Sequence, residues 1–150
     1  LKEYSTTGNR EIDGGLNYML QKANKTLNQV DVQINIPEDL YFNNFNICVI
    51  VGNLVDNAVR EASKSEEKLL TIKMQVKQEV LLIFIENSYS GKILEKRNGL
   101  QTTQPELAIH GLGLENVKKV VIANGGEINI DYTSNRFCVQ VLLYMSRIKN

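Results

Sequence analysis

Two pairs of strand-like segments, each joined by a short polar turn, constrain the fold of this chain more than any other feature. Residues 69–77 and 80–86 are rich in β-branched and aliphatic side chains, and strands near 127–133 and 136–145 flank a Thr-Ser-Asn turn. Strands joined by so short a turn pair antiparallel, because a parallel pair needs a crossover of about a dozen residues or more. The two hairpins therefore argue against a doubly wound parallel sheet.

Three other segments have the apolar spacing of amphipathic helices. Apolar side chains recur every three to four positions in residues 9–28 and 44–63, and a third helix is expected from about 112 to 124, closed by a pair of glycines. Residues 30–36 alternate apolar and polar side chains, which predicts a short half-buried strand. This order of elements predicts an α+β domain, a two-layer α/β sandwich whose helices pack on one face of the sheet.

The charge balance argues against nucleic-acid and membrane partners. The chain has 150 residues with 17 Lys and Arg against 17 Asp and Glu, so its formal net charge is zero. A nonspecific nucleic-acid site or attachment to an anionic membrane needs a basic surface. The longest apolar runs, 47–51 and 80–85, fall short of the roughly 18–20 residues that span a bilayer. We therefore expect a soluble domain that binds no nucleic acid and makes no direct membrane contact.

The two cysteines and the first residues indicate the compartment and the context. Cys48 and Cys138 each lie in an apolar stretch with no second ligand at metal spacing, which favours buried free thiols in a reducing compartment. We expect the cytoplasm. The chain opens on Leu-Lys-Glu without Met and without a charged-then-apolar leader, which suggests a piece of a longer protein.

A polar ridge lies on the second expected helix. Asn53 and Asn57 are separated by about 40° around the helix axis, and Arg60 lies within about 20° of Asn53. Asp56 and Glu61 border the ridge, which itself holds no carboxylate. A solvated helix face is one interpretation. The other is a ligand site, because Asn is a poor helix former, an Asn carbonyl suits Mg²⁺ and an Arg suits phosphate.

A glycine-containing motif, His-Gly-Leu-Gly-Leu-Glu-Asn-Val at 110–117, precedes the third expected helix. Glycines let backbone N–H groups approach a ligand closely, and a helix start adds its positive dipole end, so the motif predicts an anion site. A plain glycine-rich helix start explains the same residues. The motif lacks the Lys-Ser/Thr of a Walker loop, and a long polar loop, not a strand, precedes it, which excludes a dinucleotide fingerprint.

The end of the second hairpin strand is the third candidate element. Residues 83–91 read Ile-Phe-Ile-Glu-Asn-Ser-Tyr-Ser-Gly, so a buried strand ends in polar side chains and a turn. A carboxylate or amide at such a place can read an adenine amino group, although a turn explains the residues as well. The long polar loop over residues 88–110 follows, and loops of this length in compact domains are often functional.

Together, the segments 53–58, 83–91 and 110–117, in this order and followed by Gly-Gly at 125, resemble the ATP-binding domains of the GHKL family. The resemblance is greatest to the catalytic domains of bacterial sensor histidine kinases, especially the peptide-quorum-sensing type, and it spans roughly residues 9–145. It implies the Bergerat fold: a mixed sheet of about five strands covered on one face by helices, with ATP between the second helix, the loop and the sheet.

The resemblance also implies site residues. Asn57 matches the Mg²⁺-binding Asn of the family, Asn53 the first residue of the same motif, and Arg60 a basic position that touches phosphate. Asn53 and Arg60 are the expected catalytic residues. The expected nucleotide-binding residues are Asn53, Asn57, Arg60, Asn87, Gly91, His110, Gly111, Leu112, Gly113 and Leu114.

Three positions depart from the family pattern. Asn87 stands where most members have an adenine-reading Asp, Tyr89 replaces a glycine of the second motif, and Gln104 stands where related sequences often have Lys. A neutral amide is a weaker acceptor than a carboxylate, so the contact to the adenine amino group is expected to be weaker. His110, the only histidine, is either a phosphate-proximal lid residue or a side chain that orders the helix start, and not the phosphoacceptor.

The implied function is transfer of the γ-phosphoryl group of Mg-ATP to a histidine on a separate dimerisation helix of the same sensor kinase. Asn53 favours transfer over hydrolysis, because an amide cannot accept a proton from water. Alternatives are a nucleotide-binding regulatory module with weak or no kinase activity and, less favoured, a GHKL ATPase. Residues 1–150 would form one domain, with 1–8 ending the dimerisation segment and 90–110 forming an ATP lid. The expected partners are the phosphoacceptor helices and a response regulator, and the expected place is the cytoplasmic part of a membrane-bound sensor kinase.

Overall fold

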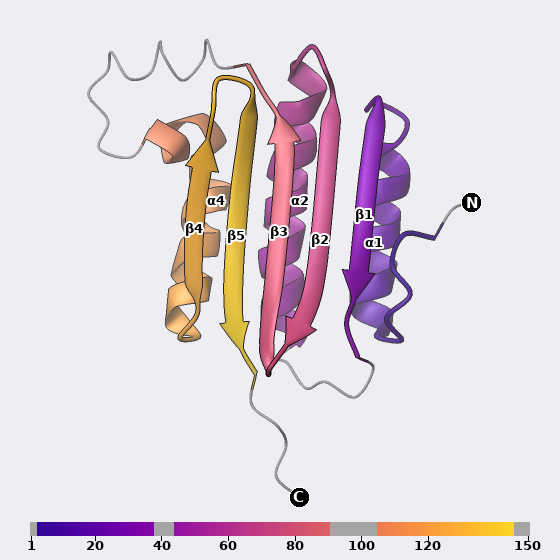
Figure 1. The fold of residues 1–150 in the computed structure, drawn as a ribbon, viewed down its shortest axis with the longest axis vertical. Helices are drawn as coiled ribbons and strands as arrows, with labels where there is room; N and C mark the ends of the chain where they lie inside the picture. The colour runs from indigo at the N-terminus through magenta and orange to yellow at the C-terminus, as the bar shows by residue number, and fades with distance from the viewer. Residues whose placement is uncertain (1–2, 38–43, 91–104, 146–150) are drawn as a thin grey trace, which may run out of the picture.

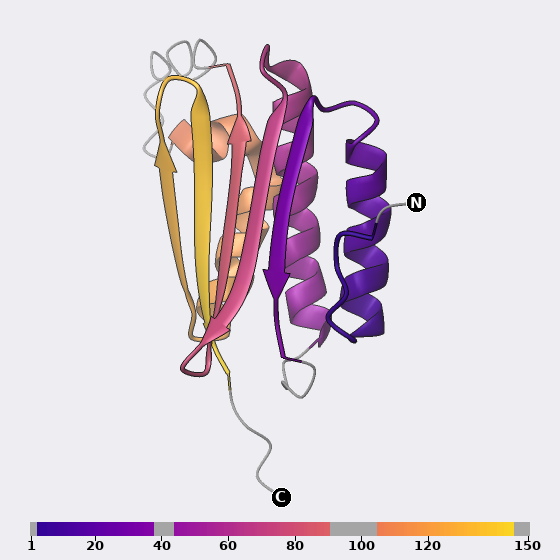
Figure 2. The ribbon, with the colours of Figure 1, turned by 45° about the vertical axis from the view of Figure 1, so that its right-hand side comes forward.

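The computed structural model describes residues 3–37, 44–90 and 105–145, with the backbone alone for residue 44 and residues 105–113. These residues form two layers, a five-stranded sheet and three helices that all lie on one face of it (Figures 1 and 2). The predicted two-layer α+β architecture is confirmed. In the described part of the chain, no helix has both the length and the apolar character needed to cross a membrane.

The sheet is mixed, in the order β1-β2-β3-β5-β4. The strands are β1 (Gln29–Asn35), β2 (Leu69–Lys77), β3 (Val80–Ser88), β4 (Glu127–Tyr132) and β5 (Arg136–Tyr144). Both predicted hairpins form, β2 with β3 and β4 with β5, and β3 also pairs antiparallel with β5. The turn of the first hairpin has positive φ at Gln78 (53°) and Glu79 (64°), as a tight two-residue hairpin requires. Only β1 and β2 are parallel, because a helix connects them.

The helices are α1 (Arg10–Ala23), α2 (Asn44–Lys64) and α4 (Pro105–Ala123). The helix expected over 9–28 ends at Ala23, five residues early, although Leu27 is still buried. Because Leu27 is apolar, the helical spacing in the sequence continues past the residue at which the helix ends. At the end of α4, Gly125 has a φ of +72°. A Cβ at Gly126 would lie 2.5 Å from the Leu142 carbonyl oxygen, so this glycine allows α4 to approach β5.

The start of α4 corrects one expectation. We expected a helix from about 112, but α4 begins at Pro105, and Gly111 and Gly113 lie inside it. Proline is favoured at the first helical position, where its missing N–H has no intrahelical partner to lose. The two glycines were interpreted as an anion-binding segment just before the helix, but the low helix propensity of glycine does not prevent it from lying inside one. Of the lid expected over residues 90–110, residues 91–104 lie outside the described residues.

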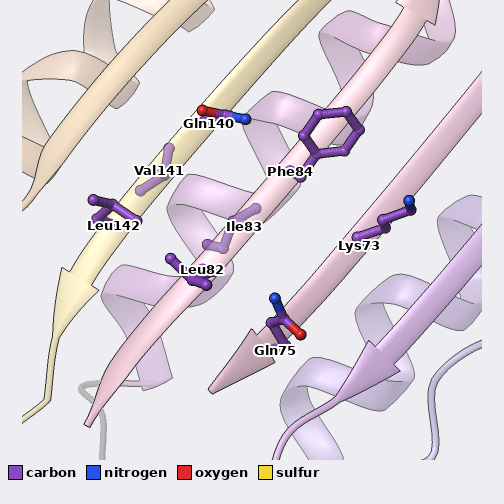
Figure 3. Close-up of a pocket in the computed structure, with 8 residues that line it drawn as sticks. All are labelled: Lys73, Gln75, Leu82, Ile83, Phe84, Gln140, Val141 and Leu142. Carbon is purple, nitrogen blue, oxygen red and sulfur yellow. The ribbon is translucent and has the colours of Figure 1, made fainter. Parts of the chain in front are cut away.

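The core lies between the sheet and the helices, and the other face of the sheet is open. Alternate residues of β2 and β3, such as Ile72 and Ile83, are buried beneath the helices. On the open face β2, β3 and β5 line a shallow hollow of about 290 Å³ (Figure 3). There the Lys73 ammonium lies 5.8 Å from the centre of the Phe84 ring. This hollow contains none of the predicted site residues.

Candidate functional site

The polar ridge of α2 faces α4. Asn46 lies on the same side of α2 as Asn53 and Asn57, and its Nδ2 donates to Asn124 Oδ1 at the end of α4, over 3.0 Å. Val55 and Val59, on another side of α2, line a groove against α1, and Asp56 and Arg60 lie along the same groove. The ridge therefore lies on the side of α2 nearer to α4, with Arg60 at the edge toward the α1 groove, and not on a fully solvated face.

Asn57 is the most informative residue of the ridge. It is 6% exposed, and its Oδ1 accepts a hydrogen bond from Arg60 Nη2 at 3.2 Å. Its Nδ2 donates to nothing within the described part of the chain. An unpaired buried amide destabilises a fold by about 1–3 kcal/mol, and such groups in native proteins call for an explanation such as a ligand, ion or water. Asn57 therefore has the unsatisfied hydrogen-bonding capacity of a ligand-binding side chain.

Arg60 lies beside Asn57 at the solvent edge of the ridge. Its guanidinium forms an ion pair with Asp56 over 2.6 Å, and its side chain is 50% exposed. An ion pair this exposed is weak, about 0–1 kcal/mol, so an anionic ligand can compete for the guanidinium. Further N–H donors of the guanidinium remain for a phosphate group.

Asn53 has a local structural explanation. Its Nδ2 donates to the Val49 carbonyl one turn earlier, over 2.8 Å. This bond accounts for an amide in the middle of a helix without a ligand. It leaves Oδ1 as an acceptor on the same side of α2 as Asn57. The ridge thus offers two amide oxygens and a guanidinium, which fit a hydrated Mg²⁺ ion and phosphate oxygens.

Asn87 lies at the end of β3, in a small polar cluster under the helices. It is 2% exposed, and its Nδ2 donates to the Ser88 carbonyl at 2.9 Å. The Ser88 hydroxyl lies 2.7 Å from the Ser65 hydroxyl just beyond α2 and accepts from the Leu69 N–H at 2.8 Å. The amide oxygen of Asn87 remains to accept from a ligand. The strand end predicted to read a base is therefore buried, polar and adjacent to the end of α2.

Tyr89 is a structural residue in this arrangement. It is buried, its hydroxyl donates to the Thr133 carbonyl, and its ring meets Phe137 edge-on with 5.9 Å between centroids. Burial raises the pKa of the phenol, and nearby Tyr132 raises it further, so the hydroxyl stays a donor. The tyrosine that replaces a glycine of the family pattern thus holds the β4–β5 turn against the end of β3.

The structure describes the remaining predicted site residues only in part. Gly91 lies outside the described residues, and His110 to Gly113 are described as helical backbone only. Their N–H groups belong to the body of α4, so a helix start does not supply the expected anion site in this conformation. Leu114 is 1% exposed, with its side chain in the core.

Glu61 is more deeply buried than the sequence predicted. The sequence placed it at the border of the ridge, but it is 6% exposed, one turn beyond Asn57. The spacing in the sequence already indicates this position for Glu61. Asn53, Asn57 and Glu61 recur every four residues and form one stripe along the helix, which we call the α2 stripe. Each step turns about 40°, and the stripe therefore runs from the partly exposed Asn53 into the interior.

Comparisons with solved structures support this arrangement of elements. The histidine kinase AdeS of Acinetobacter baumannii superposes with a TM-score of 0.64 at 18% identity, covering 90% of this chain and 63% of that one. The catalytic domain of the histidine kinase ThkA superposes with a TM-score of 0.63 at 20% identity, covering 93% of each chain. At this identity the likeness shows the fold. No curated protein matches the chain in sequence.

The sequence itself matches a family. Residues 42–144 match the GHKL domain. The match includes the α2 stripe, the polar end of β3 and the whole of α4. More than two thirds of the chain is covered, and the fold described above is that of histidine kinase catalytic domains. The chain therefore belongs to the GHKL family.

Proposed function

We propose that this chain binds Mg-ATP through the α2 stripe, Arg60 and the polar end of β3. GHKL domains bind ATP in general, and the observation that carries the proposal here is the buried, unpaired amide of Asn57. The Oδ1 atoms of Asn57 and Asn53 would hold Mg²⁺. Arg60 and the unpaired Nδ2 of Asn57, which only donates, would contact phosphate oxygens. Bound Mg²⁺ would neutralise charge on the phosphate groups.

We further propose that the chain is the catalytic domain of a protein-histidine kinase. The γ-phosphoryl group would pass to a histidine on a separate dimerisation helix of the same kinase, and later to a response regulator. Asn53 supports transfer over hydrolysis, because an amide cannot act as a general base toward water. The likeness in fold to AdeS and ThkA is consistent with this assignment. The parent would be a membrane-bound sensor of the peptide-sensing type, with this domain in the cytoplasm and residues 90–110 as its lid.

One observation favours a second candidate, a regulatory module that binds nucleotide with little kinase activity. Asn87 is neutral, and its Nδ2 already donates to the backbone of Ser88. A weak contact to the base would leave the nucleotide poorly oriented, and phosphoryl transfer tolerates little misalignment.

The deciding experiment supplies the missing acceptor. The chain is incubated with γ-labelled Mg-ATP, alone and with the histidine-bearing helix hairpin of its own kinase. We expect acid-labile phosphohistidine on the hairpin and none on the chain, because His110 adjoins the motif expected to hold the phosphates. A hairpin with Gln in place of its histidine is the control. ATP binding without transfer would select the regulatory module, and self-labelling abolished by His110→Gln would refute the site assignment.

A further inference from the structure

The side chain of Glu61 is largely buried and makes few polar contacts with the described residues. The side chain is 8% exposed, and its polar partner among the described residues is Lys64, with 3.8 Å between Nζ and Oε1. The Lys64 side chain is 58% exposed, and an ion pair that long with a solvated lysine stabilises little. No hydrogen bond to this carboxylate comes from the described part of the chain. A buried charge in such a position normally has a partner that satisfies it.

The location of Glu61 limits which groups could be its hydrogen-bond partner. Along α2, Glu61 lies one turn after Asn57 and one turn before Ser65, and Ser65 touches Ser88 at the end of β3. Glu61 therefore lies between the proposed Mg²⁺ ligand and the strand end that carries Asn87. The neighbouring positions of α2 that face the sheet, Ala58 and Ala62, are apolar core residues, so Glu61 is a polar exception in this part of the interface.

The negative charge of Glu61 determines which part of a nucleotide its side chain can contact. An ionised carboxylate only accepts hydrogen bonds, and it repels phosphate oxygens. The donors that a nucleotide offers are the ribose hydroxyls and the exocyclic amino group of the base. We propose that Glu61 accepts a hydrogen bond from the nucleoside half of the bound nucleotide and contributes specificity for it. Asn57 and Asn53 then face the phosphates, so the α2 stripe sets the direction in which the nucleotide lies.

This inference rests on the proposed ATP site. Glu61 would add a charged hydrogen-bond acceptor at the nucleoside end of that site, where Asn87 is neutral. A charged acceptor forms a stronger hydrogen bond than a neutral amide oxygen. Asn87 retains only its amide oxygen for a ligand, because Nδ2 is engaged by Ser88. Glu61 would therefore restore a charged acceptor at the nucleoside end from the helix instead of from the strand.

The test compares the chain with Glu61→Gln, which keeps the size of the side chain and removes its charge. Dissociation constants are measured by calorimetry for Mg-ATP and for three analogues, which lack the 2′-hydroxyl, the 3′-hydroxyl or the 6-amino group. We expect Glu61→Gln to weaken ATP binding about tenfold, the effect of one charged hydrogen bond. One analogue should bind the unmodified chain about tenfold more weakly than ATP and bind the variant no worse than ATP, which identifies the donor.

Glu66→Gln is the matched control, because Glu66 is an exposed carboxylate five residues further along, and it should leave all four constants unchanged. The inference is overturned if Glu61→Gln binds ATP as tightly as the unmodified chain, or keeps its discrimination against all three analogues. A loss for ATP that disappears when Mg²⁺ is chelated also overturns it, because Glu61 would then act on the metal. Failure of the unmodified chain to bind ATP would reject the proposed function instead.

Discussion

At the scale of single residues, hydrogen-bond pairing separates buried polar side chains that build the fold from those that are available to a ligand. Tyr89 and Asn57 are both buried polar residues of the matched family region. The hydroxyl of Tyr89 is paired with the Thr133 carbonyl, whereas the amide nitrogen of Asn57 has no partner in the described residues. A satisfied group adds to stability, and an unsatisfied one detracts from it until something binds. The two residues should therefore respond differently to substitution.

Tyr89→Phe should lower stability without affecting nucleotide binding. The substitution removes the hydroxyl that donates to Thr133 and keeps the ring that packs on Phe137. We expect the free energy of unfolding to fall by about 1 kcal/mol and the Mg-ATP dissociation constant to stay within about twofold, measured by urea denaturation and calorimetry. Tyr132→Phe is the control, since Tyr132 is 40% exposed. Weaker ATP binding with unchanged stability would place Tyr89 in the nucleotide site.

The sequence anticipated part of this residue pattern. It placed Asn53, Asn57 and Arg60 on one ridge, because helical spacing alone determines which residues share a side. It did not anticipate that Glu61 is buried, since a charged residue beside a polar ridge is ordinarily solvated. It also could not show whether Asn53 needs a ligand, because the bond from Asn53 to Val49 depends on a side-chain rotamer.

At the scale of elements, the segment before α1 is attached to that helix by its polar groups. Asp13 accepts from the Ser5 hydroxyl at 2.6 Å, from the Thr7 N–H and hydroxyl at 2.9 and 2.8 Å, and from the Gly8 N–H at 3.0 Å. One turn later, Asn17 Oδ1 accepts from the N–H groups of Tyr4 and Ser5 at 2.7 and 2.8 Å. Residues 3–8 thus pack as part of this domain, whatever precedes them.

This attachment should weaken in acid. Burial raises the pKa of Asp13, but the hydrogen bonds from Ser5, Thr7 and Gly8 outweigh it, so the pKa lies below its ordinary value. A carboxylate whose pKa is lower in the folded state stabilises the fold above its unfolded pKa of about 3.9, and that contribution is lost as pH falls through the folded value. Asp13→Asn should therefore lower the free energy of unfolding at pH 7, by at most about 1 kcal/mol given its partial exposure.

The measurement is urea denaturation at pH 7 and at pH 2.5, with and without the substitution. The difference between Asp13→Asn and the unmodified chain should shrink at the lower pH. Glu11→Gln is the control, because Glu11 is also an acidic residue in the first turn of α1 but is exposed. An equal loss in both variants would attribute the effect to the helix dipole and not to the attachment of residues 3–8.

The elements themselves differ in how far the sequence determines them. The two hairpins follow from alternation and turn residues, which act over a few positions. The parallel pairing of β1 with β2 involves residues about 40 positions apart, and no local sequence pattern predicts it. The start of α4 was placed too late because Gly111 and Gly113 have low helix propensity, and local propensity alone does not determine where a helix begins.

At the scale of the whole molecule, the proposed nucleotide site joins parts that are distant in sequence. α2, α4 and the end of β3 lie together on the helix-covered side of the sheet (Figure 2). Asn46 contacts Asn124 of α4 near the start of α2, and Ser65 contacts Ser88 of β3 just beyond its end. A ligand that binds only when these elements are assembled stabilises the entire fold, by RT ln(1 + [L]/Kd). The unpaired amide of Asn57 would then be satisfied in the bound state, so part of the stability of the domain should come from its ligand.

Mg-ATP should therefore raise the free energy of unfolding of the whole chain, and Asn57→Ala should reduce that gain. At 100 times Kd the gain is about 2.7 kcal/mol, and a tenfold loss of affinity would remove roughly 1.4 kcal/mol of it. Without nucleotide, Asn57→Ala should cost little, because the lost amide is only partly satisfied.

Asn46→Ala, on the same side of α2, is the control: it removes the bond to Asn124 and should lower stability without nucleotide while keeping the full gain. Thermal or urea denaturation with increasing Mg-ATP measures both quantities. If Asn57→Ala and the unmodified chain gain equally from Mg-ATP, Asn57 does not bind the nucleotide or its metal. The unpaired amide would then be only a defect of the core, tolerated because the buried side chains around it supply enough stability without it.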